Sequence, residues 1–410
     1  MRRAISYGRQ TIDEDDIRSV VKALRSDFLT QGPLSEEFED RLKRHTGAKY
    51  AVVCSNGTAA LHLAILAAGI HRGERVITSP MTFLASSNSA LYAGAIPVFA
   101  DIDEETFNID PAEIERKIRY NSPVRAIIPV HFAGHPCDME RISEVARENN
   151  LVVIEDACHA LGASWKDRLG NLQRVGNCSH SDMTVFSFHP VKSITTGEGG
   201  AITTNDPVLY KKLKLLRSHG VTKNAAEFKA HDDAPWLYEM HELGFNYRLS
   251  DIQCALGISQ IERLGSFIKR RNEIASLYGA MLLKYPFVRT PAVNEDRTSA
   301  FHIYPARIPF GDLGISKKEW FLMMKSIGIH PQVHYIPVHL QPYYRSMFGY
   351  NPGDFPRAEK FYSEEVSLPI YPTLTDEEAG AVVEAIVSTI ACAAAASREA
   401  AGLKRILAAS

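Results

Sequence analysis

The sequence predicts an α/β protein: a three-layer α/β/α domain built on a mostly parallel sheet, followed by a smaller α+β domain. Two observations lead to this prediction. Over the first two hundred residues, short apolar runs rich in β-branched residues alternate with helix-like segments. This alternation is typical of strand–helix–strand units, whose helices cover both faces of a parallel sheet. Beyond about residue 205 the regular alternation ends, and longer helical patterns dominate.

Each expected strand is a short apolar run that ends in polar or small residues. The runs are 50–54, 75–78, 96–100, 126–129, 151–154, 183–186 and 201–204. The expected helices between the earlier runs are 57–68, 111–118 and 139–148, the last two with apolar residues on one face and charges opposite. Residues 183–204 hold two strand-like runs without a helix between them. Some reversed or edge pairing is therefore expected there.

The second half of the chain predicts a smaller domain that packs tightly against the first. Helical patterns occupy 206–218, 249–263, 266–283, 316–327 and 375–391, a strand-like run occupies 301–308, and the polar stretch 222–241 is expected to be a loop. We place the domain boundary near residue 265. The large domain is then 1–265, the small domain is 266–392, and 393–410 is an alanine-rich tail whose composition favours helix.

Composition and charge exclude several classes of protein. Lys and Arg number 46 against 48 Asp and Glu, a net charge of −2, so we expect neither nucleic acid nor an anionic membrane as partner. No run of 18 apolar residues predicts a membrane span, and the basic N-terminus lacks the apolar core of a secretory signal. The six cysteines form no CxxC pair. We therefore expect a reduced, cytoplasmic protein without a metal site.

An acid and a lysine follow two of the expected strands. The run 151–154 leads into Glu155 and Asp156, at the kind of strand end where ligands bind in open α/β sheets. Lys192 lies 36 residues further on in a stretch of apolar and hydroxyl residues that includes Ser187. A desolvated lysine can act as a nucleophilic amine and form a Schiff base with pyridoxal phosphate, whose ring nitrogen needs an acid partner. The alternatives are a helix cap or a solvated turn for the acid and a solvated surface position on a turn for the lysine.

Two further segments suit the same cofactor. After 50–54, a helix is expected to begin with Gly57, Thr58 and Ala59, where free N–H groups and the helix dipole favour a phosphate. This segment is not a P-loop, and a simple helix cap is the alternative. Phe83 follows the next strand and could stack on a flat ring, or be part of the core. In chain order, the four segments supply the parts of one pyridoxal phosphate site.

The sequence resembles the DegT/DnrJ/EryC1/StrS family of sugar aminotransferases from Tyr7 to about Ile390. The matching motifs include SNGTAALHLA, VIEDACHALGA, VFSFHPVKSITTGEGGAITTND and GFNYRLSDIQCALGISQIERL. The resemblance implies a fold-type I pyridoxal phosphate enzyme with the architecture of aspartate aminotransferase. It implies these roles: Lys192 as the Schiff-base lysine, Asp156 as partner of the ring nitrogen, Thr58, Ala59 and Ser187 as phosphate contacts, Phe83 and His159 as ring contacts, and Asn246 as a phosphate contact reaching in from the neighbouring subunit of a homodimer.

A narrower resemblance concerns the substrate. LTQGPLSEEFE, LRSHGV and HPQVHYIPVHLQPYY resemble the transaminases of pseudaminic acid biosynthesis. These enzymes aminate C4 of a UDP-linked 2-acetamido-2,6-dideoxy-hexos-4-ulose, and glutamate is the expected amino donor. The resemblance suggests Tyr7, His334 and Tyr335 as substrate contacts, with packing roles as the alternative. A dTDP- or GDP-linked keto sugar is the rival substrate, and a non-catalytic regulator is the rival class. Sugar dehydratases of this type carry histidine at the position of Lys192.

Overall fold

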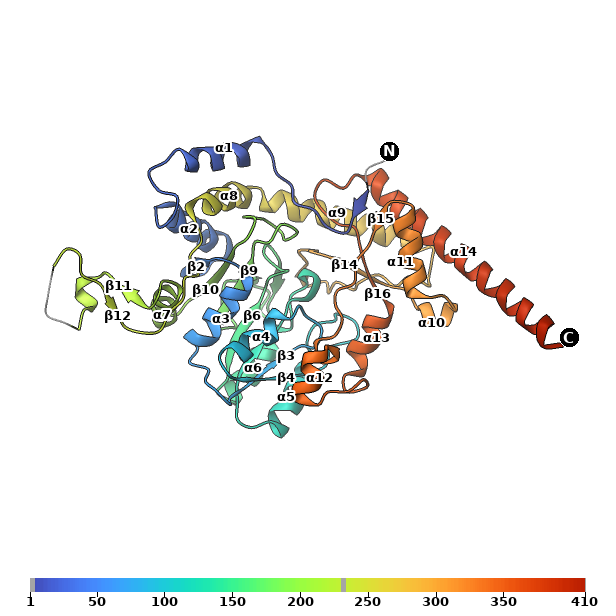
Figure 1. Ribbon diagram of the computed structural model, residues 1–410, viewed down its shortest axis with the longest axis horizontal. Coiled ribbons are helices and arrows are strands. Elements are labelled where there is room, and N and C mark those ends of the chain that lie inside the picture. The colour runs from blue at the N-terminus through green and yellow to red at the C-terminus, as the bar shows by residue number, and fades with distance from the viewer. Residues whose placement is uncertain (1–3, 230–233, 410) are drawn as a thin grey trace.

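A computed structural model describes residues 4–229 and 234–409, and its centre is one seven-stranded sheet (Figure 1). The strand order is β2-β10-β9-β6-β5-β3-β4. The bounds are β2 (Tyr50–Cys54), β3 (Arg75–Thr78), β4 (Ile96–Phe99), β5 (Val124–Ile128), β6 (Val152–Asp156), β9 (Met183–Ser187) and β10 (Gly200–Thr204). β10 is antiparallel to both of its neighbours, whereas the other pairs are parallel. The predicted sheet and its reversed pairing are confirmed, but the reversed strand is internal.

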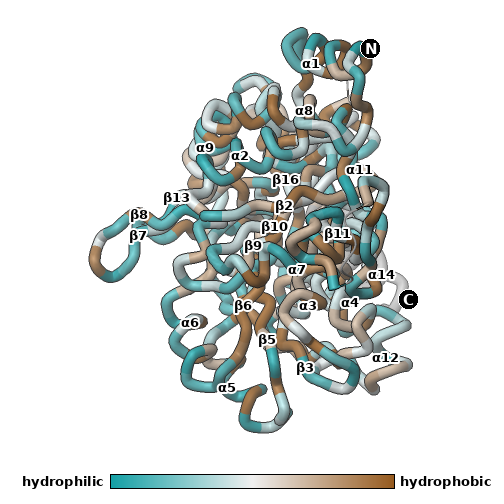
Figure 2. Tube along the Cα trace, turned by 90° about the vertical axis from the view of Figure 1, so that its left-hand side faces the viewer, coloured by the Kyte–Doolittle hydropathy of each residue, from teal (hydrophilic) through white to brown (hydrophobic). Residues whose placement is uncertain are grey.

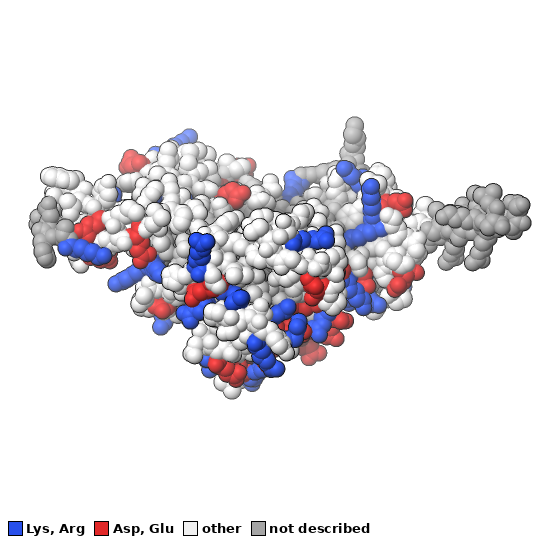
Figure 3. Space-filling view, turned by 60° about the horizontal axis from the view of Figure 1, so that its bottom comes forward, with Lys and Arg blue, Asp and Glu red and all other residues white. Residues whose placement is uncertain are grey.

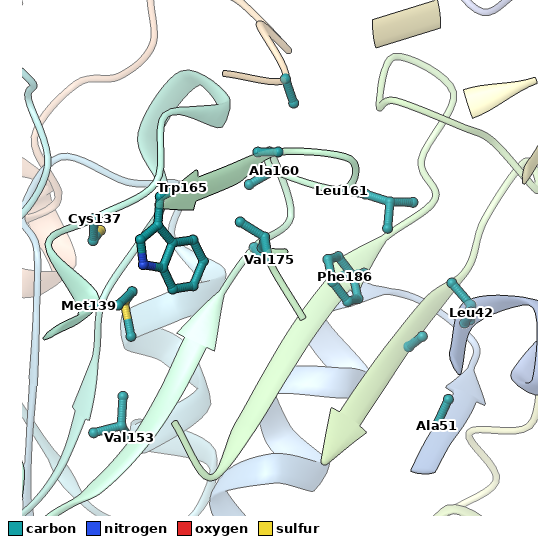
Figure 4. Close-up of a cluster of buried hydrophobic side chains, with 14 of the residues drawn as sticks. Leu42, Ala51, Cys137, Met139, Val153, Ala160, Leu161, Trp165, Val175 and Phe186 are labelled. Carbon is teal, nitrogen blue, oxygen red and sulfur yellow. The ribbon is translucent and has the colours of Figure 1, made fainter. Parts of the chain in front are cut away.

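Helices cover both faces of this sheet because alternate side chains of each strand point to opposite sides. In β2, Ala51 and Val53 join one apolar core, whereas Val52 and Cys54 join another. Figure 4 shows the first core, with Trp165 and Phe186 in it. The helices around the sheet are α1 (Glu14–Leu24), α2 (Leu34–Thr46), α3 (Gly57–Ala67), α4 (Ala85–Tyr92), α5 (Pro111–Tyr120), α6 (Met139–Glu148), α7 (Pro207–Arg217) and α8 (Asp251–Glu262). The three-layer architecture is therefore confirmed.

The C-terminal third builds a separate apolar core from helices and one short antiparallel pair, β14 (Tyr304–Arg307) with β16 (Glu365–Leu368). Its helices are α9 (Leu264–Leu282), α10 (Phe310–Leu313), α11 (Lys317–Ser326), α12 (Pro342–Phe348), α13 (Pro356–Glu364) and α14 (Asp376–Ala409). α14 carries helix into the alanine-rich tail. A further core joins Phe99 and Phe107 to Tyr344 and Phe361 across the two regions. The domain boundary at residue 265 stays a prediction.

Short strands and turns complete the fold. β7 (Ser164–Lys166), β8 (Leu172–Arg174) and β13 (Arg297–Thr298) form a small sheet, and β1 (Ile5–Ser6) pairs in parallel with β15 (Ile329–His330). The stretch 222–241, expected to be a loop, contributes to a two-stranded arm, β11 (Val221–Thr222) with β12 (Glu239–Met240), that projects from the body (Figure 1). Strands of two residues carry no readable alternation, so the sequence did not predict this pair. The rest of the stretch is loop and turn, as expected, apart from 230–233, which lie outside the described residues. The 3₁₀ turns are Phe132–Gly134, Ala225–Glu227 and Val338–Leu340.

Polarity follows the layers of the fold. Figure 2 shows apolar residues concentrated along the central strands. Figure 3 shows acidic and basic side chains interspersed on one face of the molecule, in keeping with the small net charge of −2. Over residues 4–229 and 234–409, no helix combines the length and the apolar character that crossing a membrane requires.

A glycine fixes how closely α8 approaches α2 beneath the loop of Lys192. A methyl group added at Gly257 would lie 2.5 Å from Cζ of Phe38, a fully buried ring. The ring of Phe38 in turn contacts that of Phe188 at a centroid distance of 5.2 Å. Because Phe188 stands four residues before Lys192, this contact helps to position the lysine loop.

We expect Gly257→Ala to destabilise the protein by about 1–3 kcal/mol, since the new methyl overpacks a core that has no room for it. Urea unfolding of both proteins measures the difference. Gly279→Ala in α9 is the matched control, because a methyl there meets nothing within 4 Å and removes the entropic penalty of glycine. The control should be neutral or up to about 1 kcal/mol stabilising. Equal effects of the two changes would contradict the close-packing argument.

Candidate active site

A cavity of about 710 Å³ opens at the carboxyl edge of the central sheet. The loops after β2, β3, β6 and β9 reach it, and the C-terminal region closes its far side. Most of the site residues predicted from the sequence line it, namely Tyr7, Gly57, Thr58, Ala59, Phe83, Asp156, His159, Ser187, Lys192, His334 and Tyr335. The fold thus gathers residues that are more than three hundred positions apart.

Lys192 is a partly buried amine rather than a solvated surface lysine. Burial lowers the pKa of its ammonium, although the negative charge of Asp156 opposes this shift. Its Nζ lies 3.4 Å from Nε2 of His302. Burial also holds the pKa of His302 well below its usual range, so the imidazole is neutral and can accept a hydrogen bond from the amine.

Asp156 ends β6 and presents its carboxylate to the cavity. Ser86 Oγ donates a hydrogen bond of 2.6 Å to Oδ2, and the backbone N–H of Cys158 donates to Oδ1 at 3.1 Å. Two donors on two different oxygens fix the orientation of the carboxylate. The interpretation of Asp156 as a simple helix cap is therefore wrong, since no helix begins there.

Glu155, the adjacent acid, faces the opposite side of the sheet. Its Oε2 lies 2.7 Å from Nε2 of His131, and Thr184 Oγ1 donates to its Oε1 at 2.9 Å. Burial alone would raise the pKa of Glu155, but the bonds from His131 and the hydroxyls outweigh it and lower the pKa. The backbone N–H of Cys137 donates to Nδ1 of His131 at 2.9 Å, so the imidazole carries its proton on Nε2 and donates it to Glu155. This buried hydrogen-bonded pair lies outside the cavity lining.

The start of α3 forms an anion site beside Ser187. Asn56 caps the helix by accepting the N–H of Ala59, which leaves the first N–H groups, those of Gly57 and Thr58, without intrahelical acceptors. A methyl group at Gly57 would lie 2.9 Å from Cβ of Ser187, so only glycine lets the helix end approach that strand. Free N–H groups, a helix dipole and a nearby hydroxyl together suit a phosphate.

Aromatic and imidazole rings form the opposite wall. Tyr335 OH lies 3.0 Å from Nε2 of His159, and the rings of His159 and His302 are 4.4 Å apart. Burial lowers the pKa of His159 and raises that of Tyr335, so both side chains are neutral. Phe83 is 57% exposed, with its ring 6.1 Å from that of Tyr335. The sequence did not single out His302, because this residue lies within the expected strand 301–308 and no recognisable motif surrounds it.

Asn246 does not line this cavity in its own chain. It is exposed, and its backbone pairs with Ser218 near the base of the projecting arm. Its neighbour Tyr247 does line the cavity. The assignment of Asn246 to the site of a second subunit stays a prediction.

The sequence matches the model of the DegT/DnrJ/EryC1/StrS aminotransferase family over residues 10–387. The chain belongs to this family. It is 40% identical over 383 residues to the spore coat polysaccharide biosynthesis protein SpsC of Bacillus subtilis, covering 93% of this chain and 96% of that protein. It is 38% identical over 387 residues to UDP-4-amino-4,6-dideoxy-N-acetyl-beta-L-altrosamine transaminase of Campylobacter jejuni, covering 94% and 97%.

Solved structures of sugar aminotransferases share the fold. PseC of Helicobacter pylori, an aminotransferase involved in the biosynthesis of pseudoaminic acid, matches with a TM-score of 0.86 and 32% identity over 95% of this chain and all of its own. The putative sugar aminotransferase Spr1654 of Streptococcus pneumoniae matches in its PLP-form with a TM-score of 0.85 and 29% identity over 95% and 99% of the two chains. This DegT/DnrJ/EryC1/StrS member is therefore a sugar aminotransferase with the predicted pyridoxal phosphate fold.

Pyridoxal 5′-phosphate is the cofactor of this family member, and the cavity fits it. The anion site at Gly57 and Ser187 suits its phosphate, Lys192 offers an amine, and Asp156 offers a carboxylate held by two donors. Among residues 4–229 and 234–409, no group of three or more His, Cys, Asp or Glu side chains is arranged to hold a metal ion.

We expect Glu155→Gln to destabilise the protein by about 1–3 kcal/mol, because the new NH₂ group faces only donors, Nε2–H of His131 and the hydroxyls of Ser181 and Thr184. The lowered pKa of Glu155 contributes stability that is present above its usual value of about 4.5 and is lost as the pH falls below that value. The difference in unfolding free energy should therefore shrink as the pH falls below about 4.5. Urea unfolding at several pH values measures it. A variant with wild-type stability but no activity would instead assign Glu155 to the reaction.

Proposed function

We propose that this sugar aminotransferase transfers an amino group from glutamate to C4 of a UDP-linked 2-acetamido-2,6-dideoxy-hexos-4-ulose. The product is UDP-4-amino-4,6-dideoxy-N-acetyl-β-L-altrosamine, a precursor of pseudaminic acid. The observation that carries the proposal is the near full-length similarity to the Campylobacter jejuni transaminase, supported by the fold of Helicobacter pylori PseC. The cavity agrees with it, since the same space that suits the cofactor also has a wall of neutral hydrogen-bonding rings.

In this proposal the chemistry divides between three side chains. When bound, pyridoxal phosphate supplies the electron sink for a carbon that loses a proton. Lys192 Nζ takes and returns that proton, a role for which burial prepares it by favouring the neutral amine. Asp156 holds a positive charge on the ring nitrogen, while Ser86 and the N–H of Cys158 keep its carboxylate in place.

The substrate contacts proposed are Tyr7, His334 and Tyr335. All three line the cavity, and the rings of Tyr7 and His334 are 5.1 Å apart. Burial lowers the pKa of His334 to about 3 and raises the pKa of Tyr7, so both are neutral. Neutral hydroxyls and imidazoles suit the hydroxyl and amide groups of a sugar nucleotide.

We expect the purified enzyme, loaded with cofactor and given glutamate, to aminate the UDP-linked 4-keto sugar in preference to dTDP- and GDP-linked analogues. NMR of the products identifies the aminated carbon and its configuration. Lys192→Ala is the matched control, and it should lose the yellow absorbance of the lysine-bound cofactor and nearly all turnover. Activity of this variant within tenfold of wild type, about 1.4 kcal/mol, would contradict the role of Lys192.

A different nucleotide-linked keto sugar is the second candidate, because the 40% identity to SpsC points to a spore coat polysaccharide rather than to pseudaminic acid. Preferred turnover of a dTDP- or GDP-linked sugar would favour this candidate. If the protein folds and binds the cofactor but aminates none of the keto sugars, a non-catalytic regulator would be favoured.

We further propose a homodimer whose two sites each combine Lys192 of one chain with Asn246 of the other. The exposed position of Asn246, outside the cavity of its own chain, supports this arrangement.

Lys192→Ala and Asn246→Ala, each inactive alone, should therefore complement each other. When equal amounts are unfolded, mixed and refolded, half of the dimers are mixed and each holds one intact site. About a quarter of the wild-type activity should return, with refolded wild type as the reference. No recovery would place Asn246 in its own chain's site.

A further inference from the structure

A buried carboxyl group stands behind His334, on the side away from the cavity. Glu365 is fully buried at the start of β16, and its Oε2 accepts the backbone N–H of His334 at 3.0 Å. Its Oε1 is hydrogen-bonded to the hydroxyl of Ser367, which lies 2.8 Å from Nδ1 of the His334 imidazole. The side chain of Glu365 therefore contacts His334 twice, once directly and once through Ser367.

We propose that Glu365 and Ser367 form a proton relay that sets which tautomer His334 presents to the sugar substrate. Both are positioning residues, because they act through His334. The inference rests on the proposed role of His334 as a substrate contact and deepens it.

The two protonation states of Glu365 impose opposite hydrogen-bond directions. A charged Glu365 accepts the hydroxyl of Ser367, whose oxygen then accepts Nδ1–H of His334, so Nε2 keeps a lone pair. A neutral Glu365 donates from Oε1 to Ser367, which donates to Nδ1, so Nε2 carries the proton. The difference is one proton, gained or lost at Nε2. Nothing in the described part of the chain hydrogen-bonds that nitrogen, and His334 lines the cavity.

Burial and the charges around the relay place its transition near pH 8. Burial raises the pKa of Glu365 to about 8, although the Ser367 hydroxyl and the charge of Lys317 on α11 favour its charged form. Burial also lowers the pKa of Lys317 to about 8, so its charge declines over the same pH range. Arg307 is its cross-strand partner on β14, and Tyr335 also faces it. Burial, reinforced by the charge of Lys192, keeps the pKa of His334 itself at about 3. The imidazole is thus neutral throughout, and only its tautomer changes.

Glu365→Gln tests the relay because an amide can fit in one orientation only. Its oxygen must accept the N–H of His334, so its NH₂ must donate toward Ser367, and Nε2 of His334 stays protonated at every pH. Ser367→Ala breaks the relay while sparing the bond to the backbone. Glu364→Gln is the matched control: it removes the same charge at the adjacent position, outside the relay.

The measurement is ¹⁵N NMR of the cofactor-loaded enzyme labelled in its histidines, from about pH 6 to about pH 10. The His334 signal is identified by its loss in His334→Gln. In wild type and Glu364→Gln, Nε2 should change from protonated to unprotonated with a midpoint near pH 8. In Glu365→Gln and Ser367→Ala that transition should be absent. An invariant wild-type signal, or a transition that persists in folded Glu365→Gln, would overturn the proposal.

A second measurement concerns the sugar. Exchanging a donor for an acceptor at one hydrogen bond should change the KM for the keto sugar about two- to tenfold across the transition. At every pH, Glu365→Gln should show the KM that wild type has at low pH, with kcat little changed. A pH-dependent KM in this variant would count against the relay. If no keto sugar reacts, the proposed function fails, whereas the NMR result still decides the relay.

Discussion

The parallel pairing of β6 with β9 is the interaction on which the candidate site depends. In this register Glu155 pairs with Thr184 and Asp156 with Val185. Because the two strands run in the same direction, their carboxyl ends deliver Asp156 and the Lys192 loop to one edge of the sheet. Alternation sends Glu155 to the other face, where Nε2–H of His131 donates a hydrogen bond to it. A slip of one residue would exchange the two acids, so the register decides which of them can meet a ligand.

Burial then gives the cavity its electrostatic character. The imidazoles of His159, His302 and His334 all have pKa values lowered by desolvation, so none of them carries a charge at neutral pH. The anion site at α3 consists of backbone N–H groups and hydroxyls rather than side-chain cations. Apart from the carboxylate of Asp156, the amine of Lys192 therefore shares its surroundings with neutral donors and acceptors, and burial lowers its pKa.

Much of the fold and of the site was predictable, because strands buried on both faces stand out as apolar runs and site residues follow their ends. The omissions have physical causes. α4, with the sequence ASSNSALY, contains few strong helix formers and is held by its packing on α3. His302 lies 110 residues from Lys192, and no local pattern encodes that contact. Glu365 resembles any acid at a helix–strand junction until the fold places His334 against it.

The pairing of β1 with β15 means that the cavity is completed late in folding. Ile5 and Ser6 pair in parallel with Ile329 and His330, so the segment carrying Tyr7 is anchored by residues made more than three hundred positions later. During synthesis on the ribosome, the central sheet can form while Tyr7 still lacks its anchor. The wall that holds Tyr7 beside His334 is therefore assembled last, and a nascent chain has the cofactor loops before it has a closed site.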